Sequence, residues 1–149
     1  MTASTATPKA LVDTNILIYA ADPAAGDQRD VAFGLIEQLT RHGELVVSVQ
    51  VLNEFYHAST RTNKPPALTH EEASQTIQDL ANAALVLPLT ASVTPRALDA
   101  ITRSSLSFWD ALIWAAAREN SVPLVYTEDF QHGQEIEGVR FVNPFAAIP

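Results

Sequence analysis

The stretch Pro8-Lys-Ala-Leu-Val-Asp-Thr-Asn-Ile-Leu-Ile-Tyr19 decides the fold that the sequence predicts. Its apolar run at residues 10–12 is typical of a buried strand, and apolar residues resume at Ile16 after a polar interruption. Asp13 therefore stands where a strand ends and a helix begins. A carboxylate placed there needs a helix N-terminus, a hydrogen-bond donor or a metal ion as its partner. The stretch leaves two interpretations open, a helix N-cap and a chemical role, because strand-turn-helix junctions host both.

Segments with strand character and segments with helix character alternate along the rest of the chain. We predict strands at residues 10–12, 44–47, 84–89, 122–126 and 139–142, and helices that begin near Asp13, Asp27, Ser48, Thr69, Thr94 and Ser107. Such an alternation predicts an α/β sandwich with a mainly parallel sheet, because helical crossovers deliver parallel neighbours. Pro88 lies inside the third predicted strand and places that strand at an edge of the sheet.

The length and composition of the chain predict one folded domain. Its 149 residues are enough to bury a substantial core, so we assign residues 1–149 to a single domain whose first seven residues form a frayed end. No apolar run reaches the roughly 20 residues of a membrane span. The chain contains no cysteine, which is compatible with a reducing cytoplasm, where we expect the protein. A net charge of −8 argues against a broad basic face that grips nucleic acid.

Four acidic residues occupy related places in this pattern. Asp13 follows the first strand, Glu54 lies in the helix after the second, Asp110 opens the helix before the fourth, and Asp129 follows the fourth. The segments that follow parallel strands leave the sheet at the same edge, and Asp110 joins them if its helix begins there. Carboxylates that converge need counter-charge, and Mg²⁺ or Mn²⁺ prefers oxygen ligands of this kind. Such a site predicts metal-assisted attack of water on phosphorus.

Each acid also has a simpler interpretation when it is taken alone. Asp110 fits the acidic position of a capping box that begins at Ser107. Glu54 suits an exposed helix face, and Asp129, next to Glu128, suits an ordinary turn. Only convergence of the four side chains at one place favours the metal site over these alternatives.

Four short motifs carry a resemblance to a known family. They are Leu11-Val-Asp13-Thr-Asn15-Ile-Leu, Ser48-Val-Gln-Val-Leu-Asn-Glu54-Phe, Ser107-Phe-Trp-Asp110-Ala-Leu-Ile and Thr127-Glu-Asp129-Phe. In this order, and over nearly the whole chain, they resemble the PIN-domain ribonucleases, especially the VapC-type toxins of toxin–antitoxin modules. Any one motif is weak, whereas four in the family's order are fairly specific.

The resemblance implies a fold, an activity and partners. It implies a PIN-like three-layer sandwich with a five-stranded sheet of order 3-2-1-4-5, flanked by helices. The family's acidic quartet falls on Asp13, Glu54, Asp110 and Asp129, and its hydrogen-bonding neighbours resemble Asn15 and Thr127. The implied activity is Mg²⁺- or Mn²⁺-dependent cleavage of single-stranded or loop RNA that leaves a 5′-phosphate and a 3′-hydroxyl. The implied partners are a second copy, in a homodimer, and a small antitoxin that threads through a groove beside the active site.

Several other residues are candidates for contacts with these partners. Arg61, Lys64 and Arg103 suit RNA phosphates or acids of the antitoxin, although isolated surface charges are the alternative. Trp109 and Trp114 suit either the core or the stacking of bases. The loop at residues 63–67 separates two helices whose apolar faces either clamp an antitoxin helix or pack the core. The four histidines do not fall at metal-ligand spacings.

Three competing interpretations fit the sequence less well than a nuclease. A haloacid dehalogenase-like phosphatase requires an aspartate two places after its nucleophile, where this chain has Asn15. A receiver domain of a response regulator requires an early acidic pair and a lysine near the end of the fourth strand, neither of which we find. A binding module with the PIN fold but no catalysis is disfavoured because all four acids are present.

Overall fold

The computed structural model describes residues 8–148, so the frayed end predicted at residues 1–7 lies outside the described residues. The strands are β1 (Ala10–Val12), β2 (Leu45–Ser48), β3 (Leu85–Leu87), β4 (Leu124–Tyr126), β5 (Glu135–Ile136) and β6 (Val139–Val142). They form one sheet in the order β3-β2-β1-β4-β6-β5, in which every neighbouring pair is parallel except β5 and β6. The mainly parallel sheet and the predicted order of its first five strands are confirmed, with β6 as the predicted fifth strand.

The predicted number of five strands is wrong, because β5 adds a sixth strand at the edge beside β6. The two strands form a hairpin whose turn residues, Glu137 and Gly138, both have positive φ angles of 47° and 84°. Two consecutive positive φ angles define the tight turn that matches the twist of paired strands. A strand of only two residues is too short to show an alternating pattern, so no periodic signal for it was present in the sequence.

The helices begin and end close to the predicted residues. They are α1 (Thr14–Ala21), α2 (Asp27–Arg41), α3 (Val49–Ser59), α4 (His70–Ala83), α5 (Val93–Arg103) and α6 (Phe108–Glu119). Side-chain caps explain three of the starts, because Ser48, Thr69 and Ser107 each accept a hydrogen bond from a backbone N–H three residues later. Gly43, with φ at +69°, allows the chain to turn after α2.

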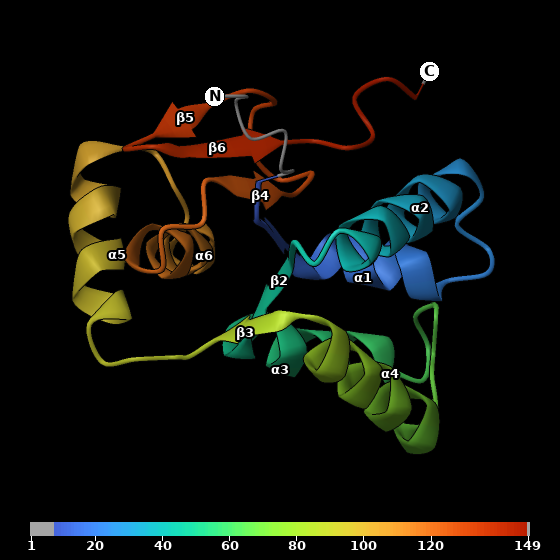
Figure 1. Cartoon of the computed structure of the whole chain (residues 1–149). Helices are drawn as coiled ribbons and strands as arrows, with labels where there is room; N and C mark the ends of the chain where they lie inside the picture. The colour runs from blue at the N-terminus through green and yellow to red at the C-terminus, as the bar shows by residue number, and fades with distance from the viewer. Residues whose placement is uncertain (1–7, 149) are drawn as a thin grey trace.

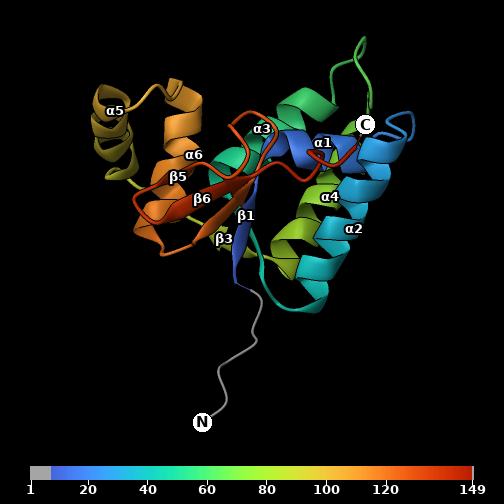
Figure 2. The same cartoon turned by 90° about the horizontal axis from the view of Figure 1, so that it is seen from above.

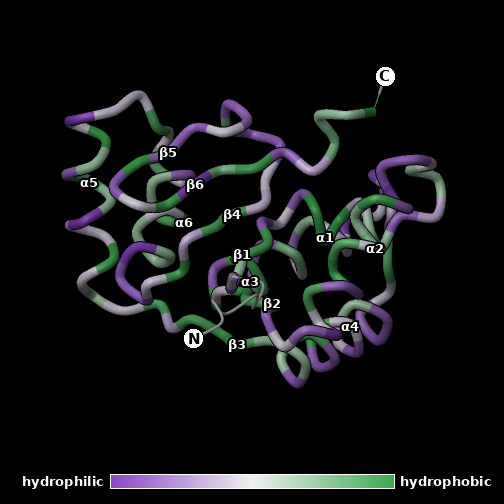
Figure 3. Tube along the Cα trace, turned by 45° about the horizontal axis from the view of Figure 1, so that its top comes forward, coloured by the Kyte–Doolittle hydropathy of each residue, from purple (hydrophilic) through white to green (hydrophobic). Residues whose placement is uncertain are grey.

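The elements form three layers, as the sequence predicts. Helices α5 and α6 cover one face of the sheet, and α1, α2 and α4 lie on the other side (Figures 1 and 2). Hydrophobic residues gather on the central strands, whereas the outward turns of α5 are hydrophilic (Figure 3). Residues 111–117 of α6 are all buried, because this helix lies between α5 and the sheet. Among helices within residues 8–148, none combines the length and apolar character that crossing a membrane requires.

The pairing of β1 with β4 brings two distant parts of the chain to the same edge. The strands are parallel, with Val12 opposite Tyr126, so Asp13 and Thr127 leave the sheet side by side. The backbone N–H of Asp13 donates to the carbonyl of Tyr126 at 2.9 Å and fixes this junction. Residues beyond these carboxyl ends lie where the strand order changes direction, which is the place where open α/β sheets bind ligands.

Candidate metal centre

Asp13 is a helix cap and also the buried centre of an acidic cluster. Its Oδ1 accepts the backbone N–H of Thr14 at 2.7 Å, which makes it the N-cap of α1. Its Oδ2 accepts the hydroxyl of Thr127 at 2.8 Å. The side chain is only 5% exposed, so both oxygens are held in a fixed direction. The two interpretations that the sequence left open therefore coexist in one residue.

Asp110 and Asp129 bring a second and a third carboxylate to Asp13. Each of these three residues offers an oxygen that lies within 4.8 Å of those of the other two. Asp110 reaches this place from the first turn of α6, where its backbone N–H donates to the hydroxyl of Ser107 at 3.1 Å. Asp129 arrives from the segment after β4 and accepts the amide of Asn15 at 3.0 Å. One oxygen from each residue is the kind of donor set that a hard cation requires.

Glu54 lies beside this cluster and not within it. Its two oxygens accept hydrogen bonds at 2.8 Å from the Thr14 hydroxyl and from the side-chain amide of Gln50. Sequence reasoning overlooked Gln50, which is 8% exposed and precedes Glu54 by one helical turn. The spacing of four residues was the available signal, because residues four apart on a helix are neighbours on its surface.

Two of the acids, Asp13 and Asp110, have raised pKa values, mainly because they are buried. Burial raises the pKa of Asp13 to about 6, against the opposing hydrogen bonds from Thr127 and Thr14, and the charges of Asp129 and Glu54 raise it further. Burial also raises the pKa of Asp110, with smaller contributions from the charges of Asp129 and Glu54. The four acids therefore act on one another electrostatically, although only three of them converge closely.

Thr127 and Asn15 connect the acids through a short network. The Thr127 hydroxyl, fully buried, donates to Asp13 and accepts the backbone N–H of Asp129 at 3.2 Å. The Asn15 amide donates to Asp129 and approaches the Thr127 hydroxyl at 3.5 Å. The Oδ1 of Asn15 is buried and has no hydrogen-bond partner in the described part of the chain. A buried carbonyl oxygen without a partner is costly unless a cation or water supplies one.

Comparison with known families agrees with this arrangement. The sequence profile of the PIN domain matches residues 10–134, which include all four acids. The chain belongs to the PIN domain family.

Solved structures of toxin–antitoxin proteins, among them VapC proteins, share the fold of this PIN domain. A toxin–antitoxin complex from Klebsiella pneumoniae is 20% identical, covers 91% of this chain and 98% of its own, and has a TM-score of 0.67. VapC20 from Mycobacterium tuberculosis, described as a toxin that cleaves the sarcin–ricin loop, is 21% identical over 81% and 90% with a TM-score of 0.63. DNA-bound VapBC from Salmonella typhimurium is 16% identical over 91% and 97% with a TM-score of 0.63. No curated protein matches the sequence significantly. At these identities the likeness establishes the fold.

The two adjacent acids after β4 of this PIN domain point to different neighbours. Glu128 accepts the hydroxyl of Tyr19 at 3.0 and 3.1 Å, whereas Asp129 lies in the cluster. Burial, and then the contact with Glu128, raises the pKa of Tyr19. The hydrogen bond between Tyr19 and Glu128 therefore connects α1 with the segment after β4, and Asp129 is the acid of this pair that lies at the site.

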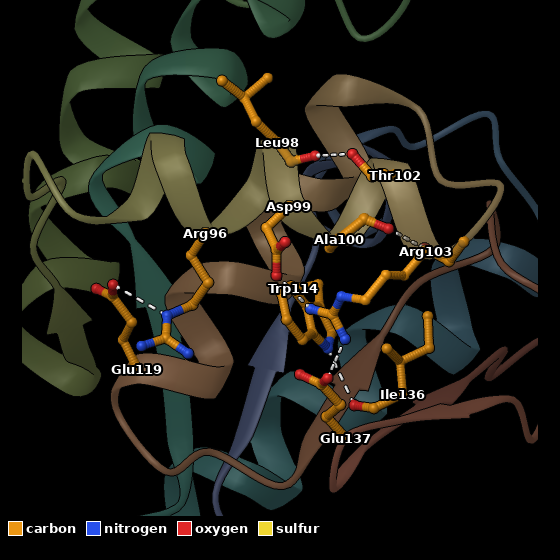
Figure 4. A network of polar contacts seen from close by, with 11 residues as sticks. Arg96, Leu98, Asp99, Ala100, Thr102, Arg103, Trp114, Glu119, Ile136 and Glu137 are labelled. Carbon is orange, nitrogen blue, oxygen red and sulfur yellow. Dashed lines mark hydrogen bonds and ion pairs between the residues drawn. The ribbon is translucent and has the colours of Figure 1, made fainter.

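The three predicted contact residues lie in different surroundings. Arg61 and Lys64 are exposed in the segment between α3 and α4. Arg103 is paired with Asp99, at 2.8 Å, and with Glu137, so its charge is already matched by two acids (Figure 4). Both ion-pair partners of Arg103 therefore lie outside the acidic cluster.

The two apolar helix faces beside the loop at 63–67 belong to the core of this PIN domain. Val51 and Phe55 of α3 and Ala73 of α4 are fully buried, so these faces pack the core. Of the two predicted alternatives, core packing is therefore the one observed, and not a clamp for an antitoxin helix. An open apolar groove lies elsewhere, between α2 and α4. Three adjoining hollows of about 230, 370 and 250 Å³ share Ile36, and two of them are lined by Phe33.

Proposed function

We propose that this PIN domain is a metal-dependent endoribonuclease that acts as the toxin of a toxin–antitoxin pair and hydrolyses single-stranded or loop RNA. The observation that carries the proposal is the convergence of Asp13, Asp110 and Asp129 from three separate elements. Structural likeness to VapC proteins supports the role as a toxin. A PIN module without catalysis has no need for an acid whose pKa is raised by burial and, to a smaller extent, by neighbouring carboxylates.

The residues at the site fit Mg²⁺ or Mn²⁺. Three carboxylate oxygens lie within 4.8 Å of one another, and the cluster has no cationic side chain among its hydrogen-bond partners in residues 8–148. The unpartnered Oδ1 of Asn15 is a further oxygen donor beside them. Hard cations prefer oxygen donors of this kind. When bound, such an ion would activate water for attack on phosphorus and offset the charge on the leaving oxygen.

Some residues of the site would hold the ion, and others would orient those ligands or the attacking water. Asp13 and Asp110 are the principal ligands, since one is rigidly held and the other begins a capped helix. Asp129 is a third ligand, or holds a water, and Asn15 sets its orientation. Glu54 orients the attacking water or ligates directly, and Gln50 and Thr14 fix its carboxylate. Thr127 fixes the position of Asp13 relative to Asp129, because its hydroxyl is hydrogen-bonded to both residues.

A substitution at Asp13 tests the proposal. We expect Asp13→Asn to abolish Mg²⁺- or Mn²⁺-dependent RNA cleavage, because the amide keeps the helix cap but removes the charge that holds the cation. Circular dichroism should remain native. Asp79→Asn is the matched control, since Asp79 is an exposed acid on α4 whose carboxylate accepts a hydrogen bond from Gln75. Cleavage that survives in Asp13→Asn, or that is equally lost in Asp79→Asn, would remove Asp13 from the site.

The proposed antitoxin would occupy the apolar groove between α2 and α4. Phe33 is 51% exposed there, and an amphipathic helix laid into the groove would bury it. Arg61 and Lys64 remain candidates for contacts with RNA or with acids of this partner. We expect Phe33→Asp to weaken binding of the proposed antitoxin at least tenfold, by calorimetry, and to leave RNA cleavage unchanged. Unchanged binding would place the partner elsewhere.

We also propose that the protein is a homodimer in the cytoplasm and that residues 1–149 form a single PIN domain. Sedimentation of the purified protein over a range of concentrations tests the first point, because a dimer held by apolar surface dissociates on dilution at a measurable midpoint. A monomer at all concentrations would contradict it.

A further inference from the structure

Trp109 is exposed to an extent that packing does not explain. Its side chain is 64% exposed on the first turn of α6, whereas Trp114 on the same helix is fully buried and donates its indole N–H to the carbonyl of Ile136 at 3.0 Å. Exposing an indole ring to water forfeits the largest apolar burial that any side chain offers. The exposed ring is therefore accessible to a ligand from solvent.

The ring lies beside the acidic cluster. Trp109 directly precedes Asp110, and a hollow of about 410 Å³ lies between Trp109 and Glu54. Gln50 joins the two sides, because its amide donates to Glu54 at 2.8 Å and approaches the carbonyl of Trp109 at 3.5 Å. A group that rests on the indole therefore lies next to the carboxylates. The hollow is open to solvent, so a flat group can enter it from the surface.

Phe108 holds the indole in place without covering it. The two rings pack edge to face, with centroids 5.3 Å apart and an interplanar angle of 63°. Phe108 is itself 37% exposed, so the pair forms a small aromatic surface at the start of α6. A preformed aromatic surface loses little conformational entropy when a flat ligand stacks on it.

The charge of the protein points to the same kind of ligand. With a net charge of −8 and a cluster of carboxylates at its centre, the protein cannot draw RNA to the site through many phosphate contacts. Stacking of a base on an aromatic ring does not depend on charge and contributes affinity for any sequence. Because an unpaired base exposes both of its faces, single strands and loops supply such a ligand, whereas a paired helix does not.

We propose that Trp109 is the stacking platform for an unpaired RNA base adjacent to the phosphodiester bond at the acidic cluster. The proposal rests on the proposed function, because it assigns part of the RNA substrate to that site. Trp109 is a binding residue in this scheme and touches no reacting atom. It would favour unpaired RNA, because only an unpaired base exposes a face that can stack on the indole, and it would not select one base over another.

The test measures binding and cleavage separately. All binding variants carry Asp13→Asn so that the RNA stays intact, and the probe is a fluorescein-labelled oligo(U) of about 12 nucleotides in Mg²⁺, followed by anisotropy. We expect Trp109→Ala to weaken binding by roughly 5- to 100-fold and Trp109→Phe to retain most of the affinity. Leu98→Ala is the matched control, because Leu98 is 52% exposed on α5, and it should bind like the parent. A ribose-phosphate oligomer without bases should bind to the parent and to Trp109→Ala equally.

The outcomes separate this inference from the proposed function. Unchanged affinity in Trp109→Ala, or no binding of oligo(U) by the folded parent, overturns the stacking role. A variant that binds RNA normally but sediments as a smaller species shows that the surface belongs to a protein contact, and it also overturns the role. If the wild type cleaves RNA and Trp109→Ala cleaves it with the same KM, only this inference fails. If binding depends on Trp109 but the wild type cleaves no RNA, only the proposed function fails.

Discussion

At the scale of single residues, Asp13 shows how one carboxylate serves structure and site together. Its two oxygens accept different donors, one from the helix that it caps and one from Thr127 across the sheet. These bonds oppose the effect of burial but do not cancel it, so the pKa remains raised to about 6. A buried carboxylate with a raised pKa is held at a cost to stability whenever it is ionised.

This cost predicts how stability depends on pH when no divalent metal is present. In the unfolded chain Asp13 loses its proton near its ordinary pKa of 3.8, whereas in the folded protein it keeps the proton to about pH 6. The folded state binds more protons between these values, so the free energy of unfolding falls as the pH rises through this window, by about 3 kcal/mol. Urea unfolding in EDTA measures it. Asp13→Asn should lack this part of the decrease; an identical pH profile in the variant would contradict the assignment.

At the scale of elements, the ends of helices and strands deliver the acids. Asp110 depends on α6, whose first turn is fixed by the hydroxyl of Ser107. Asp129 depends on the segment after β4, which Glu128 fastens to Tyr19. The serine cap was predictable from the sequence pattern, but the tyrosine contact was not, because 109 residues separate its partners.

The cap of α6 can be tested against the cap of a helix far from the acids. Ser107→Ala and Thr69→Ala each remove a hydroxyl that accepts a backbone N–H at 3.1 Å, so each should lower the free energy of unfolding by about 1 kcal/mol. Only Ser107→Ala should reduce metal-dependent cleavage, by roughly tenfold, because fraying of α6 displaces Asp110. Kinetics at a temperature where both variants are folded decide the point. Equal activities would mean that the core alone holds Asp110.

At the scale of the whole molecule, the fold gathers like charges that the chain keeps far apart. Asp13, Asp110 and Asp129 come from the junction between β1 and α1, from the first turn of α6 and from the segment after β4, and their mutual repulsion is a property of the folded state only. A cation that binds this cluster binds the folded protein far better than the unfolded chain. Binding of the metal is therefore linked to the stability of the whole domain.

This linkage predicts a thermal shift with Mg²⁺ or Mn²⁺. At a metal concentration roughly 100 times Kd, the free energy of unfolding should rise by about 2.7 kcal/mol, and Tm by about 5 to 10 °C. Scanning calorimetry at neutral pH measures the shift, and Na⁺ at equal ionic strength controls for screening. Asp13→Asn should show little of it. A wild-type protein whose Tm does not respond to either metal would contradict a metal site here.

From local periodicity and from hydrogen bonds to near neighbours, the sequence alone predicted the alternation of strands and helices, a mainly parallel sheet and the capped starts of the helices, and it singled out the four acids. The three layers, the order of the first five strands and the roles of Asn15 and Thr127 were expected from the resemblance to the PIN family and not from local pattern. Only the tertiary structure decided that three acids converge while Glu54 is held beside them, that Glu128 turns to Tyr19, and that Arg103 is neutralised by Asp99 and Glu137. These outcomes depend on contacts between residues far apart in the chain, for which local sequence carries no signal.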